Sequence, residues 1–268
     1  MSTRIAFIGG GNMATSLAGG LIAAGTTPAS IIVAEPDADR RAQLSKQFDV
    51  ATTANNLETL LRDVVVLSVK PQLMQTVCRQ LAESANVKNP LYVSIAAGIR
   101  TADIARWLGG DVAVVRCMPN TPALIQCGAT ALYANKTVSG AQQQLADEIL
   151  RAAGITAWVA DEDLLDVVTA VSGSGPAYFF LLMEAMQKTA ENLGLDKETA
   201  TSLVLQTALG AARMANESEL EVQELRARVT SKGGTTAAAI SSFEHDDFHH
   251  NVSKALNAAY NRSRELAD

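Results

Sequence analysis

Near the amino end of the chain, small residues are spaced as in a turn that receives phosphate groups. Gly9, Gly11 and Ala14 follow an apolar run that begins at Ile5. In a strand-turn-helix unit the first glycine permits a tight turn, the second lets the backbone approach a pyrophosphate, and the small third residue lets the helix pack on the strand. The helix that follows points unpaired N–H groups and a positive dipole end at the anion. This spacing predicts a dinucleotide site, and a glycine turn that serves packing alone is the alternative.

The next apolar run supports the dinucleotide interpretation. Ile31–Ala34 is rich in β-branched residues and is followed by Glu35. An acid at the end of the second strand favours the ribose 2′-hydroxyl of NADH and repels the 2′-phosphate of NADPH. Arg40 and Arg41 follow closely, and their charges would offset that repulsion. The predicted cofactor is therefore NADPH or NADH, with no preference decided.

A second segment with residues suited to an anion is Thr230–Thr236. It places Gly233 and Gly234 before Thr235 and Thr236, at the start of a helical pattern. Backbone amides and hydroxyls at a helix N-terminus form a compact receptor for a carboxylate. An ordinary helix cap is the alternative interpretation of this segment.

Parallel strands are expected to position the first motif. Val64–Val69, Leu91–Ile95 and Val112–Met118 are apolar runs separated by connections of helix length. Such runs suit the strands of a parallel sheet that helices cover on both faces, joined by right-handed crossovers. Ligands of these sheets bind beyond the carboxyl ends of the strands, so Ser68–Pro71 is expected to line the nucleotide crevice. The predicted fold class is an α/β Rossmann-type, doubly wound parallel sheet.

The pattern changes near residue 160. No convincing strand follows Asp161, and five segments have a helical period instead: Asp163–Leu193, Asp196–Asn216, Glu219–Val229, Thr235–Glu244 and Asp247–Leu266. We therefore predict a dinucleotide-binding domain at residues 1–162 and an all-helical domain at residues 163–268.

The helical half has more apolar surface than it can cover alone. Apolar side chains occur on several faces of the expected helices, for example Phe179, Phe180, Leu182, Met183 and Met186. A large apolar surface of this kind marks an interaction site. We expect an obligate homodimer joined through the residues beyond 163, with the substrate sites at or near the interface.

One segment of the first expected helix contains residues that disfavour a helix. Ser172–Tyr178 includes Gly173, Gly175 and Pro176. Glycine costs about 1 kcal/mol and proline about 3 kcal/mol relative to alanine in a helix interior. Either another backbone packs closely against this segment, or a kink exposes polar groups to a ligand.

Composition excludes several classes of protein. The chain has 268 residues, 48% of them hydrophobic, and a net charge of −6. It is long enough for a sizeable core, and without a basic stripe it is a poor partner for nucleic acid. It has no run of about 18 apolar residues and no secretory signal pattern. We expect a soluble cytoplasmic protein that does not bind a membrane.

Metal or disulfide chemistry is not expected. Cys78, Cys117 and Cys127 are odd in number and lack the spacing of metal ligands, so buried packing is the expected role. The three histidines lie among acids beside a turn and are expected to face solvent: His245, His249 and His250. No metal site, paired carboxylates or Ser-His-Asp set is predicted.

Together, the motifs resemble the pyrroline-5-carboxylate reductase family. In chain order they are the glycine turn, Ser68–Pro71, Ser94–Gly98, Arg116–Pro122, Ser172–Tyr178 and Gly233–Thr236. The match spans essentially the whole chain, and its specific part is the combination of the last two motifs. The resemblance implies a Rossmann domain followed by an all-α dimerisation domain, and homodimers that in some members build higher rings. It also implies an NAD(P)H-dependent oxidoreductase that reduces L-1-pyrroline-5-carboxylate to L-proline, the last step of proline biosynthesis.

The resemblance also implies which residues touch the ligands. The substrate carboxylate would lie on the loop that supplies the candidate catalytic-site residues Ser231, Gly234, Thr235 and Thr236. The candidate cofactor-binding residues are Gly9, Gly11, Asn12, Met13, Glu35, Asn55, Ser68, Val69, Lys70, Pro71, Ala96 and Ala97. The chain departs from the family at Lys232, where proline is usual, and at Glu35, where serine or asparagine is frequent.

The implied reaction suits a site with few titratable groups. A cyclic imine protonated on nitrogen already accepts a hydride readily, so the enzyme mainly holds the imine carbon of the ring, which becomes C5 of proline, against the nicotinamide. Thr236 is assigned orientation and hydrogen bonding. A related imine reductase or a hydroxy-acid dehydrogenase is one alternative, and the latter would need an acid for which Lys188 is the lysine near Ser172–Tyr178. A non-catalytic nucleotide-binding protein is the other, since the fold alone does not separate them.

Overall fold

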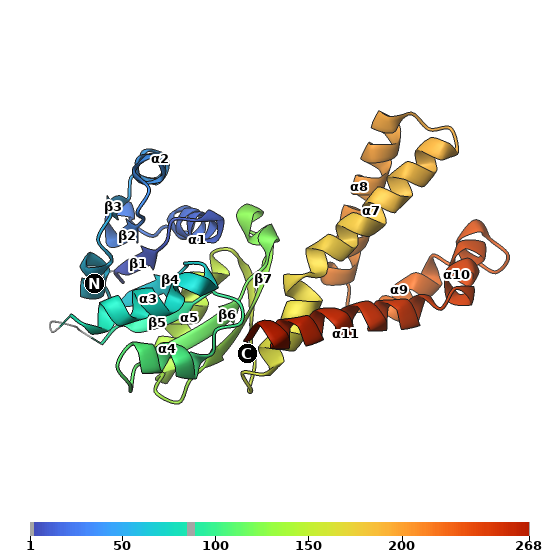
Figure 1. The fold of residues 1–268 in the computed structure, drawn as a ribbon. Coiled ribbons are helices and arrows are strands. Elements are labelled where there is room, and N and C mark those ends of the chain that lie inside the picture. Colours follow the sequence, from blue (N-terminus) through green and yellow to red (C-terminus); the bar gives the residue numbers. More distant parts are fainter. Residues whose placement is uncertain (1–2, 85–88, 268) are drawn as a thin grey trace. The chain divides into compact units, whose positions relative to one another are not determined.

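The computed structural model describes residues 3–84 and 89–267 and contains one eight-stranded sheet (Figure 1). Its strands are β1 (Ile5–Ile8), β2 (Ile31–Ala34), β3 (Ala51–Thr53), β4 (Val64–Leu67), β5 (Leu91–Ser94), β6 (Val114–Met118), β7 (Gly128–Ala134) and β8 (Gly154–Trp158). They lie in the order β3-β2-β1-β4-β5-β6-β7-β8. The strand order reverses between β1 and β4, which is where open α/β sheets bind their ligands.

Helices cover both faces of this sheet, as the sequence predicts. They are α1 (Asn12–Ala23), α2 (Ala38–Phe48), α3 (Pro71–Ala82), α4 (Thr101–Trp107) and α5 (Gly140–Arg151). Successive residues of β1 enter different cores: Phe7 packs with residues of α1, α2 and α5, whereas Ile8 packs with residues of α3 and α4. Every residue of β1, β2, β4 and β5 is buried, which explains why these strands are apolar throughout.

The carboxyl-terminal side of the sheet differs from the expected parallel arrangement. β7 pairs antiparallel with β6, while all other strand pairs are parallel. The sequence analysis also missed β3, β7 and β8. Only a short 3₁₀ turn, η3 (Thr121–Ile125), connects β6 to β7, and a parallel return would need a longer crossover. The short connection therefore reverses the chain direction.

The remainder of the described chain is helical, which confirms the predicted change near residue 160. The helices are α6 (Leu164–Val168), α7 (Gly175–Asn192), α8 (Lys197–Glu217), α9 (Val222–Arg228), α10 (Thr235–His245) and α11 (Phe248–Ala267). Instead of one helix from Asp163, the structure has a π-helical turn at Thr169–Gly173 between α6 and α7. Pro176 consequently lies in the first turn of α7, where the absence of an N–H costs little. The expected interior proline penalty does not arise.

Side chains from the end of β6 pack against the π-helical turn. The Asn120 side-chain amide donates to the Ser172 carbonyl at 3.1 Å. A Cβ added to Gly173 would lie 2.6 Å from Cε of Met118. Close packing therefore accounts for Gly173, although the neighbour is a side chain and not the backbone that the sequence analysis considered.

The chain divides into two compact units. The sheet unit comprises the residues up to Ser174 together with those from Ala259 onward, and the helical unit is Gly175–Ala258. Both ends of the helical unit are thus continuous with the sheet unit. Within the sheet unit, Ser263 of α11 donates to the buried carboxylate of Asp166 at 2.7 Å. The predicted domain division at residues 162 and 163 stays a prediction.

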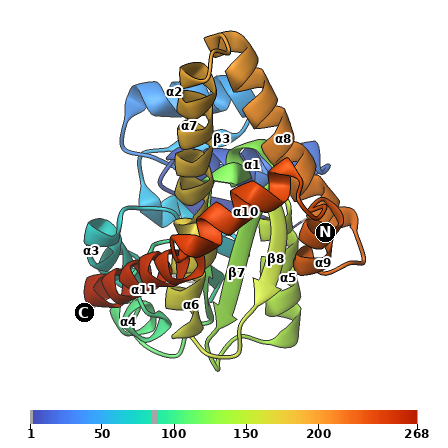
Figure 2. The same cartoon turned by 90° about the vertical axis from the view of Figure 1, so that its right-hand side faces the viewer.

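Within the helical unit, α7 and α8 pack against each other as a hairpin (Figure 2). Leu164–Asn192 is long and apolar enough to cross a membrane by length and composition alone, but only 22% of its most apolar window is buried within the chain. Phe180, for example, is 62% exposed. These apolar side chains need a cover that a single copy of the chain does not supply.

Candidate functional site

A hollow of about 400 Å³ lies beyond the carboxyl ends of β1, β2 and β4, at the point where the strand order reverses. The predicted residues among those that line it are Gly9, Gly11, Glu35, Ser68, Val69 and Lys70. Ala34, Pro36, Ala54, Asn56 and Leu73 also line it and were missed by the sequence analysis. What they share in the sequence is their position: each lies at or just after the end of a strand, or in the first turn of the helix that follows.

The glycine turn has the shape that its spacing predicts. Gly9 has a φ of +98°, and a Cβ there would lie 2.7 Å from the Ser68 carbonyl oxygen, so only glycine fits. A Cβ at Gly11 would meet nothing within 4 Å, which leaves space beside the first turn of α1. The Ser68 hydroxyl lies 2.8 Å from the Ile8 carbonyl oxygen and 2.7 Å from that of Gly9. Ser68 therefore holds the turn against the end of β4.

Glu35 faces the turn from the end of β2. Its Oε2 accepts a hydrogen bond from the Gly10 N–H at 2.7 Å, and its Oε1 accepts one from the Asp37 N–H at 3.1 Å. Neither neighbouring arginine neutralises it, because the ion pairs of the described residues include none between Glu35 and Arg40 or Arg41. The Glu35 carboxylate thus lines the hollow with two backbone N–H donors and without a direct ion pair among the described residues.

The other predicted cofactor residues lie near this edge without lining the hollow: Asn12, Met13, Asn55, Pro71, Ala96 and Ala97. Asn12 and Met13 form the first turn of α1, and Pro71 begins α3. The Asn55 side chain caps a 3₁₀ turn, η2 (Asn56–Leu61), by accepting from the Leu57 N–H at 3.0 Å.

Ala96 and Ala97 follow β5 in a loop that is fixed from its far end. The Glu162 carboxylate accepts from the Thr101 N–H at 2.8 Å and from the Thr101 hydroxyl at 2.9 Å. It also pairs with the buried guanidinium of Arg116 on β6 at 3.2 Å. Charged groups that are distant in sequence thereby hold the end of the loop. No local sequence motif predicts these contacts.

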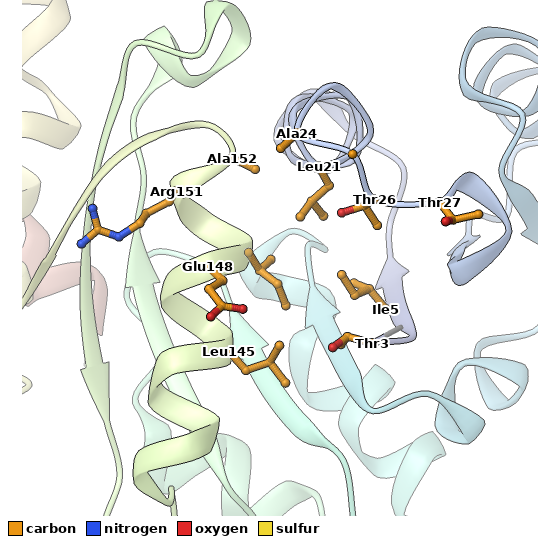
Figure 3. Close-up of a pocket in the computed structure, with 12 residues that line it drawn as sticks. Thr3, Ile5, Leu21, Ala24, Thr26, Thr27, Leu145, Glu148, Arg151 and Ala152 are labelled. Atoms are coloured by element: carbon orange, nitrogen blue, oxygen red, sulfur yellow. The ribbon is translucent and has the colours of Figure 1, made fainter. Parts of the chain in front are cut away.

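A second hollow, of about 440 Å³, lies between α1 and α5 at the amino end of β1 (Figure 3). Thr3, Leu21 and Glu148 are among the residues that line it. It lies at the amino end of a strand, whereas dinucleotides bind at the carboxyl ends. The first hollow is therefore the candidate cofactor site.

The second motif forms a tight turn that leads into α10 in the helical unit. The Gly234 N–H donates to the Ser231 carbonyl at 3.0 Å, and Gly233 has a φ of +73°. These are the features of a type II turn with Lys232 at its second position and glycine at its third. Proline is favoured at that second position because its ring fixes φ, so the usual family residue suits this turn. Lys232 lacks this restriction, and the turn is less rigid with lysine there.

The start of α10 offers free donors. Gly234 is the N-cap residue, and no side chain caps the helix. Thr235 and Thr236 occupy the next two positions, whose N–H groups have no partner within a helix. No hydrogen bond of either hydroxyl is found within residues 3–84 and 89–267. Thr236 therefore does not cap α10 through its side chain, and anion binding at this turn stays a prediction.

The cysteines do not supply a reactive thiol to either site. Burial raises the pKa of the Cys78 thiol to about 12, and burial likewise raises the pKa of Cys117. Burial, with a smaller contribution from Cys78, raises the pKa of the neighbouring Tyr92 to about 12. Cys127 is exposed, contrary to expectation, because it lies in the bend between η3 and β7.

The predicted solvent position of the histidines is confirmed, since His245, His249 and His250 are all exposed. Within residues 3–84 and 89–267, no group of three or more His, Cys, Asp or Glu side chains is placed to hold a metal ion.

Comparisons with known proteins cover both units. Residues 162–266 match the family model described as pyrroline-5-carboxylate reductase dimerisation, and residues 4–98 match that of coenzyme F420-dependent NADP oxidoreductases. A pyrroline-5-carboxylate reductase from Pseudomonas aeruginosa is 56% identical over 100% of this chain and 98% of its own.

Solved structures agree with the sequence relatives. A pyrroline-5-carboxylate reductase from Coxiella burnetii is 47% identical, with a TM-score of 0.96 and complete coverage of both chains. The pyrroline carboxylate reductase of Plasmodium falciparum, solved with NADP bound, is 29% identical with a TM-score of 0.86, over 99% of this chain and 98% of its own.

Proposed function

Because the chain belongs to the pyrroline-5-carboxylate reductase family, we propose that the hollow at the β1/β4 edge holds the nicotinamide cofactor and that the turn at 231–236 receives the substrate carboxylate. The chain is an NAD(P)H-dependent oxidoreductase that reduces L-1-pyrroline-5-carboxylate to L-proline, the last step of proline biosynthesis. The observation that carries the site assignment is the start of α10, which no side chain caps and where the Thr235 and Thr236 hydroxyls make no hydrogen bond within the described chain.

The proposed residues bind and orient rather than exchange protons. When bound, NAD(P)H supplies the hydride, which adds to the C=N carbon of the protonated imine (the carbon that becomes C5 of proline) and leaves L-proline and the oxidised cofactor. The amides of Thr235 and Thr236 face the carboxylate, and the Thr236 hydroxyl orients the ring. The reacting form is the imine that already carries its proton on nitrogen, and for this form no strong acid is needed. Holding the two reactants in register supplies the main rate acceleration.

The assay that tests this function follows oxidation of NADH and NADPH with pyrroline-5-carboxylate, beside a panel of keto and hydroxy acids. We expect turnover with the imine and none with the panel. Absence of imine turnover with both cofactors would refute the proposal. Turnover of a hydroxy acid instead would favour the dehydrogenase alternative, for which Lys188 on α7 is the candidate acid.

The cofactor preference is a finer proposal. We infer that Glu35 weakens NADPH relative to a neutral residue, because its carboxylate lines the hollow and no arginine pairs with it. The bound NADP of the Plasmodium falciparum relative belongs to that protein. In this chain both cofactors are expected to work, with NADH favoured more than a neutral residue would allow.

The chain forms a homodimer through its helical dimerisation region. We infer that the interface includes the apolar face of α7 and an apolar hollow of about 730 Å³ lined by residues such as Leu182, Met186, Phe243 and Phe248. Burial between two copies would remove these side chains from water. We also propose that dimers build higher rings, which light scattering tests. The proposed compartment is the cytoplasm, which cell fractionation tests.

A further inference from the structure

Gly10, the central residue of the glycine turn, is held at its N–H and at its carbonyl by two charged side chains. The Gly10 N–H donates to Glu35 Oε2 at 2.7 Å, and the Gly10 carbonyl accepts from Arg40 Nε at 2.8 Å. Gly10 is buried, and a Cβ there would lie 2.7 Å from Cδ1 of Leu44. Both polar groups of this residue are therefore fixed by side chains that follow β2.

Arg40 extends the same contact to the first turn of α1. Its Nη2 donates to the Thr15 hydroxyl at 2.7 Å, and that hydroxyl donates to the Gly11 carbonyl at 2.9 Å. One guanidinium thus spans the segment between Gly10 and Thr15. This segment carries the amides that face a pyrophosphate in such turns.

The guanidinium of Arg40 is committed to the protein at each nitrogen. Besides the two contacts above, its Nη1 donates to Gln43 Oε1 at 3.3 Å. Arg41 points elsewhere, since its Nη1 donates to the carbonyls of Glu35 at 2.7 Å and Pro36 at 2.8 Å. An arginine that receives a 2′-phosphate presents its donors to it, whereas Arg40 places Nε and Nη2 on the turn and the start of α1 and Nη1 on Gln43.

We propose that Glu35 and Arg40 form a clamp on Gly10, and that Arg40 is a positioning residue for the pyrophosphate turn rather than a receptor for the 2′-phosphate. The inference rests on the proposed cofactor site. It assigns Arg40 an equal effect on NADH and NADPH, because both carry the pyrophosphate. Selectivity between them is left to Glu35, whose carboxylate lines the hollow.

The test compares full-length Arg40→Met with Arg41→Met, which removes a neighbouring charge that does not touch the turn. Affinities are measured by calorimetry for two probes. ADP-ribose has the pyrophosphate but no 2′-phosphate, and adenosine 2′-monophosphate has the 2′-phosphate but no pyrophosphate. For Arg40→Met we expect ADP-ribose, NADH and NADPH to bind about 10-fold more weakly, the loss typical of a charged hydrogen bond. Adenosine 2′-monophosphate, kcat and the KM for the imine should change less than about twofold. Arg41→Met should retain its affinity for ADP-ribose and NADH.

Selective loss of NADPH and adenosine 2′-monophosphate in Arg40→Met would overturn the proposal, because it would make Arg40 a phosphate receptor. Unchanged affinities throughout would also overturn it. If Arg40→Met does not fold, Thr15→Val replaces it. This variant keeps the bond from Arg40 to Gly10 and removes the Thr15 hydroxyl, with its bonds to Arg40 and Gly11, and we expect ADP-ribose to bind about 3-fold more weakly. Unchanged binding there would equally count against the clamp. ADP-ribose binding does not involve the imine. If wild-type protein binds ADP-ribose but does not reduce the imine, the proposed function is refuted and the clamp on Gly10 is not.

Discussion

At the scale of single residues, the two proposed binding regions use different groups for their ligands. The turn before α10 presents backbone amides and two threonine hydroxyls and contributes no charge of its own beyond Lys232. The cofactor hollow instead contains a carboxylate, Glu35, bound to a backbone amide. Substitutions at these residues therefore separate substrate recognition from cofactor selection.

Thr236→Ala is expected to lower kcat/KM for pyrroline-5-carboxylate by about 10- to 100-fold, because a hydrogen bond to a charged ligand contributes up to about 3 kcal/mol. Cofactor KM values should hardly move. Thr236→Ser keeps the hydroxyl and is the matched control, expected to stay near wild type. Gly234→Ala is a poorer probe, since its Cβ would lie 2.5 Å from Ser231 Oγ and disturb the turn. Normal kinetics in Thr236→Ala would remove Thr236 from the substrate site.

Glu35→Gln should lower the KM for NADPH relative to that for NADH. It removes a charge whose repulsion of a partly shielded phosphate is on the order of 1 to 3 kcal/mol, yet keeps an acceptor for the Gly10 N–H. Glu35→Ser loses both charge and acceptor, so it should shift the same ratio while weakening both cofactors. Steady-state kinetics with each cofactor measure this. An unchanged ratio in both variants would show that Glu35 does not face the ribose.

At the scale of elements, turn geometry explains why the substrate loop can depart from its family. Ser231–Gly234 closes by a hydrogen bond of 3.0 Å, and Gly233 supplies the positive φ. Lys232 occupies the position at which proline would restrict the unfolded chain. The turn therefore forms without proline, with a higher entropy cost of folding.

Lys232→Pro is expected to stabilise the protein by about 0.4 to 1 kcal/mol through the unfolded state. Its backbone N–H makes no hydrogen bond within the described chain, so proline loses no contact there. Calorimetry should show a higher Tm than for wild type and for the control Lys232→Ala, which removes the side chain without the ring. A lower Tm for Lys232→Pro alone would show that the backbone at this position does not accept proline.

At the scale of the whole molecule, the exposed apolar surface of the helical unit requires a second copy. The most apolar window of Leu164–Asn192 is only 22% buried within one chain. The family match names a dimerisation region over 162–266. These two observations support the proposal that the apolar face of α7 is part of the dimer interface.

Phe180→Glu should dissociate the dimer, because it would bury an unpaired charge in the interface. Light scattering should report a monomer at concentrations where wild type is dimeric, with loss of activity. Leu61→Glu is the control, since Leu61 on η2 is 61% exposed and Phe180 62%, but Leu61 lies in the sheet unit. A dimeric, active Phe180→Glu protein would exclude the α7 face from the interface.

Local patterns in the sequence determined the apolar strands β1, β2, β4, β5 and β6, the helical character after residue 160 and the two motifs. β1, β2, β4 and β5 are apolar because helices cover both sides, and the glycine spacing follows from a turn that only Gly9 can make. The helical segments after residue 160 likewise have a clear period. Each of these requirements is met within a few neighbouring residues, so a single sequence displays it.

Only the tertiary structure decided the contacts made across long separations. β7 pairs antiparallel with β6 because the connection through η3 is short. The clamp on Gly10 joins this residue to Glu35 and Arg40, which lie 25 and 30 positions further along the chain. The pair of Asp166 with Ser263 joins residues 97 positions apart. Composition and period do not encode such partners, because the direction of a side chain is set by packing against elements that the chain brings together only on folding.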